Sequence, residues 1–172
     1  MSVSIDITDQ DVFTALVALL ATFLPTGTPV VQGLDNEVAM PPTGFVLLTS
    51  GSMSRLGTNV HTYNSANQTK SVVASTRYEV GIDLVGPLSQ SWAMQLQILF
   101  RDEYATSQMP ANIQPLYTDD PMQIPLVAGE AQYEQRWRVR AHLEYDPTIT
   151  TAQQSATAIS IGLVPIDKTF HP

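Results

Sequence analysis

The chain has 172 residues and a mass of 18.8 kDa, the size of one domain spanning residues 1–172. Only 14% of its residues are charged, the net charge is −8 and there is no cysteine. Disulfides, zinc–thiolate sites, iron–sulfur clusters and thiol catalysis are therefore excluded, and a protein that binds the DNA backbone is disfavoured. The hydrophobic share of 44% is enough for a sizeable core.

The N-terminal segment predicts a helix that runs to Leu24. Thr8 can cap it, Asp11 completes the spacing of a capping box, and the apolar run 12–24 forms two adjacent stripes before Pro25. The run is shorter than the roughly 20 residues of a membrane span. We expect neither a membrane span nor a signal peptide here. The remaining face of the helix has small, uncharged side chains: Thr14, Ala18, Ala21 and Thr22. Either the chain's own domain covers this face, or another subunit packs on it.

Residues 30–32 and 45–56 are each predicted to form a strand. The segment 58–70 is polar, rich in Asn, Ser and Thr, and has no periodicity, which is typical of a long mobile loop or a β-arm. In the second case Asn64 and Asn67 are candidates for contact with a neighbouring molecule.

A strand over 72–85 follows, with apolar side chains at every second position. A second helix is predicted from Ser89 or Ser91 to about Thr106. Met94 and Ile98 lie off its main apolar face, where charged side chains would be expected, and are therefore candidates for an interface.

Residues 109–129 contain four prolines and predict an extended loop. Alternation over 133–145 predicts the strongest strand of the chain. A weak helix over 151–160, a last strand over 161–166 and a loose C-terminal tail over 167–172 complete the prediction. The irregular alternation of strands and helices indicates an α+β fold, with a mainly antiparallel sheet, two principal helices packed on one face, and long loops or arms.

The sequence holds no recognisable catalytic or cofactor motif. His61, His142 and His171 are far apart and lack metal-ligand spacing. Three acidic pairs could serve a small metal-dependent hydrolase only if the fold brought their carboxylates together: Asp35/Glu37, Asp102/Glu103 and Asp119/Asp120. We therefore expect no enzyme, no cofactor and no metal site, and keep the hydrolase as a remote alternative.

The most informative group is Arg136, Arg138 and Arg140, because these three basic residues share one face of the strand 133–145. Like charges at this spacing repel unless partners lie across from them. Glu79 and Asp83 are candidate partners if the two long strands pair, which would make an intramolecular charge ladder. The alternative is contact with an acidic partner or a neighbouring subunit, a use that suits arginine more than lysine.

Several runs of the sequence resemble the tail terminator, or neck terminator, proteins of tailed bacteriophages. The resemblance covers nearly the whole chain in consistent order and is carried by IDITDQDVF (5–13), VVQGLDNEVAMP (30–41), RLGTNV (55–60), WA (92–93), RDEYA (101–105), PLYTDDP (115–121) and QYEQRW (132–137). The family brings no catalytic residues with it.

The resemblance implies a small α+β structural protein of the virion, assembled in the host cytoplasm and located at the head–tail junction. It implies a homo-oligomeric ring, typically a hexamer, that caps the head-proximal end of the tail tube, ends its polymerisation and joins the tail to the head connector. The implied partners are the tail tube protein, the connector and, in contractile tails, the sheath. DNA would pass through the lumen without specific binding, and an acidic chain suits such a channel. Another neck or connector protein, or a tube subunit, remains the alternative.

Overall fold

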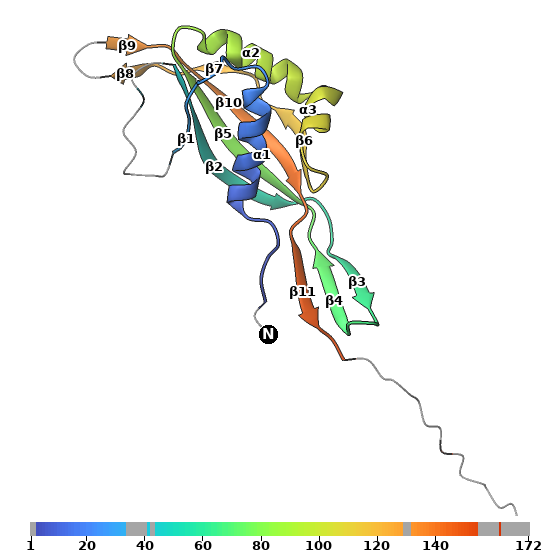
Figure 1. Ribbon diagram of the computed structural model, residues 1–172. Coiled ribbons are helices and arrows are strands. Elements are labelled where there is room, and N and C mark those ends of the chain that lie inside the picture. Colours follow the sequence, from blue (N-terminus) through green and yellow to red (C-terminus); the bar gives the residue numbers. More distant parts are fainter. Residues whose placement is uncertain (1–2, 34–40, 42–43, 129–131, 155–161, 163–172) are drawn as a thin grey trace, which may run out of the picture.

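A computed structural model describes residues 3–33, 41, 44–128, 132–154 and 162 (Figure 1). The α+β prediction is confirmed. A six-stranded main sheet has the order β1-β2-β5-β10-β6, with β7 also paired to β10. Only β1 runs parallel to its neighbour β2; the other pairs of this sheet are antiparallel. Its strands are β1 (Val30–Gln32), β2 (Phe45–Arg55), β5 (Thr76–Val85), β6 (Ile113–Thr118), β7 (Met122–Gln123) and β10 (Arg136–Tyr145).

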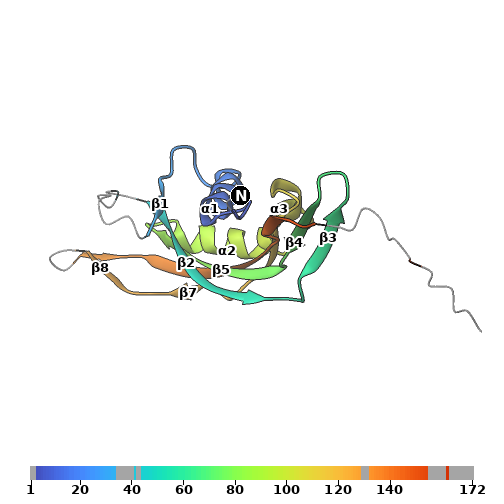
Figure 2. The same cartoon turned by 90° about the horizontal axis from the view of Figure 1, so that it is seen from below.

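Three helices lie on one face of this sheet (Figure 2): α1 (Asp9–Ala21), α2 (Ser89–Phe100) and the short α3 (Glu103–Gln108). The capping box predicted for α1 is present, because the backbone N–H and the hydroxyl of Thr8 both donate to Asp11 Oδ2, at 2.8 and 2.7 Å. These hydrogen bonds hold the pKa of Asp11 below its ordinary value.

The core lies between the helices and the covered face of the sheet. Alternate residues of β5 and β10 point into it, as their period-two pattern predicts, and meet buried side chains of α1 and α2. The centre of the core includes Leu16, Leu20, Tyr78, Ile82, Leu84, Leu96, Val139 and Leu143, each of them fully buried.

The single helix predicted for 89–106 is wrong, because the chain breaks it at Arg101 and Asp102. The Arg101 guanidinium donates to the Thr118 carbonyl at 2.8 Å, and the Asp102 carboxylate accepts the Tyr104 N–H at 2.8 Å and caps α3. Neither Ser89 nor Ser91 caps α2; its N-cap is Leu88, and the Ser89 hydroxyl points to the Gln135 carbonyl.

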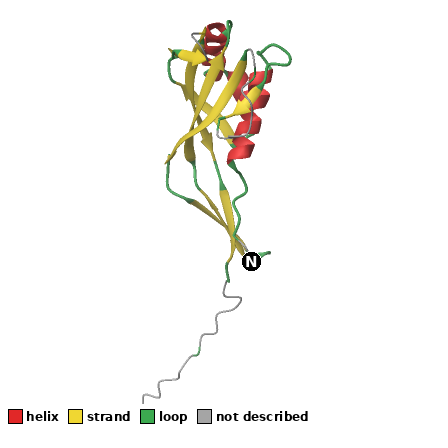
Figure 3. Ribbon diagram, turned by 90° about the vertical axis from the view of Figure 1, so that its left-hand side faces the viewer, coloured by secondary structure: helices red, strands yellow, loops and turns green. Residues whose placement is uncertain are grey.

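A second, three-stranded sheet projects beyond the main sheet (Figures 1 and 3). It consists of β3 (Val60–Asn64), β4 (Thr69–Val73) and β11 (Thr148–Ala152), and we call it the arm. Its order β11-β4-β3 matches β10-β5-β2, because each arm strand is joined along the chain to one of these three main-sheet strands. The segment 58–70 therefore contains all of β3 and the first two residues of β4, the two strands of a β-hairpin.

Two further predictions need correction, one of a strand and one of a helix. The strand predicted over 72–85 is broken at Ala74 and Ser75, where the Ala74 N–H turns to the Pro147 carbonyl. The helix predicted from 151 onward is wrong at its start, because residues 151–152 pair with β4 as part of β11. Thr148–Thr151 are β-branched, which favours a strand. The rest of that segment, from 155 to 160, lies outside the described residues.

The loop predicted over 109–129 is also wrong in part, because it contains β6, β7 and β8 (Leu126–Ala128). Pro115 is tolerated in β6, since this strand lies at the sheet edge and one side of its backbone needs no ladder partner. The strand predicted over 133–145 splits at Gln135 into β9 (Gln132–Glu134), which pairs with β8, and β10.

The strand predicted over 161–166, apart from Gly162, and the tail 167–172 lie outside the described residues. Within the part of the chain that the structure describes, no helix is long and apolar enough to cross a membrane.

Candidate interaction surfaces

The main sheet has one face that no helix of the described chain covers, and it carries the charged residues of β5 and β10. In register, Arg138 lies opposite Asp83, Arg140 opposite Gly81, and His142 opposite Glu79. Because side chains alternate along a strand, these groups all point away from the core. We call this surface the open sheet face.

Asp83 is the fixed point of the open sheet face, since it is fully buried and two arginines bind it. Arg138 donates through Nε and Nη2 to the two carboxylate oxygens at 2.7 and 2.8 Å, and Arg136 Nη2 donates at 2.6 Å. Burial alone would raise the pKa of Asp83, but the hydrogen bonds from Arg138 and Arg136 outweigh it and keep the pKa below its ordinary value. The same contact raises the pKa of Arg138.

Arg140 is held much more loosely. Its Nε lies 3.8 Å from Glu79 Oε1, and both side chains remain in contact with water, at 54% and 26% exposure. Glu79 also accepts a hydrogen bond from the Ser52 hydroxyl. The intramolecular charge ladder is therefore present, tight at Asp83 and loose at Glu79, and Arg140 keeps most of its hydrogen-bonding capacity.

A cavity of 260 Å³ lies beside the ladder. Its lining combines two guanidinium groups, two carboxylates and two apolar side chains: Arg138, Arg140, Asp119, Asp120, Met122 and Ile124. Met122 is 61% exposed. Next to it the ring of Tyr117 stacks on that of His142, with centroids 4.3 Å apart, and His142 Nε2 lies 3.3 Å from Asp119 Oδ1.

The helix layer presents a second surface, the exposed backs of α1 and α2. Met94 and Ile98 are 47% and 65% exposed, as their place off the main apolar face predicts. On α1 the small uncharged face at Thr14, Ala18, Ala21 and Thr22 is also exposed. The explanation that its own domain covers this face is wrong for the described part of the chain.

The arm presents a third surface. Asn64 shapes its turn, because Asn64 Oδ1 accepts the backbone N–H groups of Ala66 and Asn67 at 3.0 and 3.3 Å, while Asn67 itself is exposed. The sequence reasoning missed Val60 and Tyr63, which are 62% and 40% exposed on β3. The available signal was the strand propensity of Val60, Thr62 and Tyr63, hidden by the polar composition around them.

The acidic pairs do not converge where they can be located. Asp102 caps α3, and Asp120 accepts a hydrogen bond from Gln97 at 2.8 Å. Asp35 and Glu37 lie outside the described residues. Among the residues whose positions are given, no group of three or more His, Asp or Glu side chains could hold a metal ion.

The model of the phage neck terminator protein family matches residues 10–170. The chain belongs to this family. A neck terminator is a structural protein of the phage virion, in its neck or tail, and not an enzyme. A comparison with curated proteins found no match.

Among solved structures, the terminator fold is similar to the sheath/tube terminator, in its extended state, of an extracellular contractile injection system called PVC. The TM-score is 0.52 and the sequence identity is 13%, over 95% of this chain. The neck terminator spans 64% of the length of that chain. At this identity the likeness concerns the fold.

Proposed function

We propose that copies of this chain, six in number, form a ring that caps the head-proximal end of the tail tube. The ring ends polymerisation of the tube and joins the tail to the head connector. The family match over residues 10–170 carries this proposal, and the fold shared with a terminator of sheath and tube supports the tube, and the sheath of a contractile tail, as partners. DNA passes through the lumen without specific binding.

The three exposed surfaces support an assembled state. An isolated domain rarely leaves a sheet face, two helix backs and an arm open at once, and assembly subunits bury such surfaces against neighbours. We propose Arg136, Arg138 and Arg140 on the open sheet face, Met94 and Ile98 on α2, and Asn64 and Asn67 on the arm as contact residues. Of these, Arg136 and Arg138 act through the buried ladder, which fixes the shape of the surface.

The best probes are residues that the fold itself does not need. Arg140→Gln and Ile98→Ser change exposed side chains, so the unfolding free energy should stay within about 1 kcal/mol of wild type. Arg138→Glu is a poor probe, because it would leave Asp83 beside a second carboxylate and unfold the chain. The substitutions at Arg140 and Ile98 should each weaken assembly of the ring by about tenfold or more. The matched control is Gln95→Ser, an exposed substitution on the same helix.

The test measures the mass of the purified chain and the length of tails made with and without it. A ring mass in solution or on tube ends, and overlong tails when the gene product is missing, are the expected results. Tails of normal length without the chain would overturn the terminator function. Assembly of the chain alone into long tubes would indicate a tube subunit instead.

A further inference from the structure

We propose that the arm of one copy docks into a groove beside α1 of the next copy, and that this contact closes the ring. The proposal rests on the ring-forming function proposed above and deepens it by naming the two surfaces that meet.

The arm lacks a covering layer on both sides. Every residue of β3 is exposed, and no residue of β4 is fully buried. A three-stranded sheet of this kind needs a packed hydrophobic face for its stability, and the described part of the chain supplies none. One face of the arm is more apolar than the other. It carries two cross-strand rows: Ile149, Val72 and His61, and then Thr151, Lys70 and Tyr63. Ile5 extends the first row through its bridge to Ile149.

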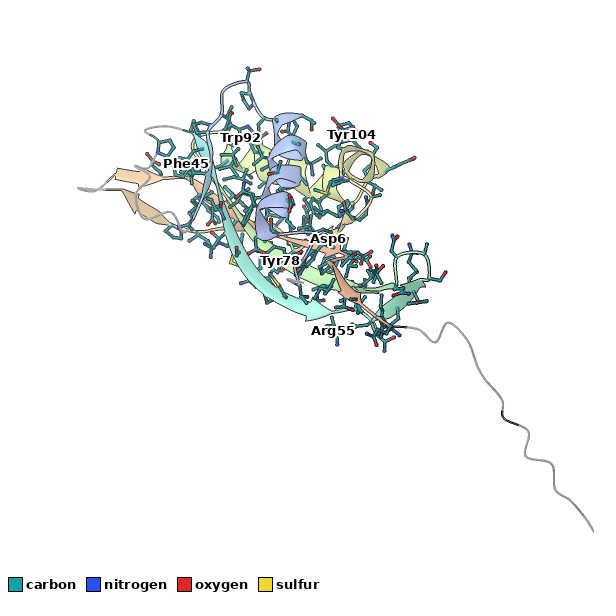
Figure 4. All side chains as sticks on the ribbon, turned by 60° about the horizontal axis from the view of Figure 1, so that its bottom comes forward. Asp6, Phe45, Arg55, Tyr78, Trp92 and Tyr104 are labelled. Atoms are coloured by element: carbon teal, nitrogen blue, oxygen red, sulfur yellow. The ribbon has the colours of Figure 1, made fainter. Side chains whose placement is uncertain are left out.

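The arm itself carries no acidic residue. Residues 56–75 and 147–154 contain no Asp or Glu, although the whole chain has 16 of them. Lys70 lies in the middle of the arm and Arg55 at its base, where Figure 4 shows it. The rest of the molecule is therefore more acidic than the net charge of −8 suggests, so another copy is a complementary partner for the arm.

The α1 groove is the matching hollow on the body. It has a volume of 410 Å³ and runs between α1 and the segment from α3 to β6. Small and apolar side chains line it, including Ala15 and Ala18 of α1 and Ile113 of β6, together with the carboxylates of Asp6 and Asp11. No Lys or Arg lines it. A hollow of this size encloses ligand-sized groups, so it accepts Tyr63 together with the stem of Lys70.

The occupant comes from a second copy because the chain's own arm cannot reach the groove. Three short connections, at residues 56–59, 74–75 and 146–147, join the body to the arm, which points away from the helices (Figure 3). Asp6 is held at this junction, since its Oδ1 accepts the Thr148 N–H at 2.6 Å. An arm that docks on a different surface of the next copy makes a head-to-tail contact, and such contacts repeat around a closed ring.

Two substitutions test the contact, each with a neighbouring control. Ala18→Arg fills the groove from an exposed helix position, whereas Gln10→Arg changes an exposed residue of the same helix outside the groove lining and outside its small uncharged face. Lys70→Glu reverses the charge on the apolar face of the arm, whereas Ser71→Glu places the same charge on its other face. Ala18→Arg and Lys70→Glu should each weaken ring assembly by about tenfold, and both controls should assemble like wild type.

A cross-link supplies a readout that a folding defect would not produce. Because the chain has no cysteine, a chain carrying Tyr63→Cys and Ala18→Cys can bond only through these positions. Oxidised rings should run as covalent multimers that reducing agent separates, while Thr62→Cys with Ala18→Cys should not cross-link.

Normal rings from Ala18→Arg and Lys70→Glu, or rings without the Tyr63–Ala18 cross-link, would overturn the arm contact and leave the terminator function standing. If tails keep their normal length when the wild-type chain is missing, the proposed function is overturned, and the arm contact with it.

Discussion

Replacing Asp83 by asparagine tests the charge ladder at its fixed point. The wild-type carboxylate accepts three hydrogen bonds from two guanidinium groups at 2.6 to 2.8 Å, and it is fully buried. Asparagine has nearly the same shape but no charge, and its amide nitrogen cannot accept a hydrogen bond. Asp83→Asn therefore leaves Arg136 and Arg138 close together without their shared counter-ion.

The magnitude follows from burial on the two sides of the contact. Breaking a fully buried ion pair costs about 3–5 kcal/mol. Here the arginine side chains are 19% and 37% exposed, so water can solvate them in part when the carboxylate is neutralised. We therefore expect Asp83→Asn to lower the free energy of unfolding by about 2–4 kcal/mol, a large share of the 5–15 kcal/mol typical of a domain.

Urea unfolding at pH 7, followed by circular dichroism, measures this loss. The matched control is Glu79→Gln, which neutralises the looser pair with Arg140 at 3.8 Å and should cost at most about 1 kcal/mol. Equal midpoints for the two variants, at unchanged urea dependence, would refute the conclusion that Asp83 organises the open sheet face.

Three further predictions concern pH and backbone. The pKa of Asp83 is lower in the folded chain than in the unfolded one. Its contribution to the free energy of unfolding is therefore present above about pH 4 and is lost as the pH falls through the folded pKa. The urea midpoints of wild type and Asp83→Asn should converge in that range, and a difference between the midpoints that does not change with pH would contradict this. Thr8→Ala removes the hydrogen bond that the Thr8 hydroxyl donates to Asp11, while the backbone N–H keeps its own, and should cost about 1 kcal/mol, whereas Thr14→Ala should be nearly neutral by the same assay. Gly86→Ala should cost about 1–3 kcal/mol, because φ is +120° and a Cβ would lie 2.9 Å from Gly44 Cα; Gly57→Ala, with open space around it, is the control, and equal thermal midpoints would contradict the strain.

The parts of the fold set by local periodicity could be predicted from the sequence. The capping box at Thr8 and the alternation through Tyr78 and Val139 each identified an element and the face that it buries. The pairing of Asp83 with the arginines was also predictable, since three like charges on one strand need a partner across it. Met94 and Ile98 stood out because apolar side chains occupied positions where a solvated helix carries charge.

The breaks within elements could not be predicted, because tertiary contacts cause them. Arg101 ends α2 by reaching the Thr118 carbonyl of β6, 17 residues further along the chain, and Ala74 leaves its strand to meet Pro147. For residues 58–70 the sequence left two alternatives open, a mobile loop and a β-arm. It could not decide between them because β3 has no buried face and owes its strand structure to hydrogen bonds with β4. The groove beside α1 joins residues about 100 positions apart, such as Asp11 and Ile113, and no local pattern records it.

The three short connections between body and arm, which hydrogen bonds from Leu56 to Ser75 and from Ala74 to Pro147 join side by side, have a mechanical consequence. A loop tether would let the arm swing, whereas β2–β3, β4–β5 and β10–β11 cross the junction side by side. A pull along the arm loads the hydrogen bonds of the main sheet in parallel and along the strand axis, so that they must fail together and not one after another. The junction thus behaves as a stiff lever, through which a displacement of the arm is passed directly to the sheet under α1 and α2.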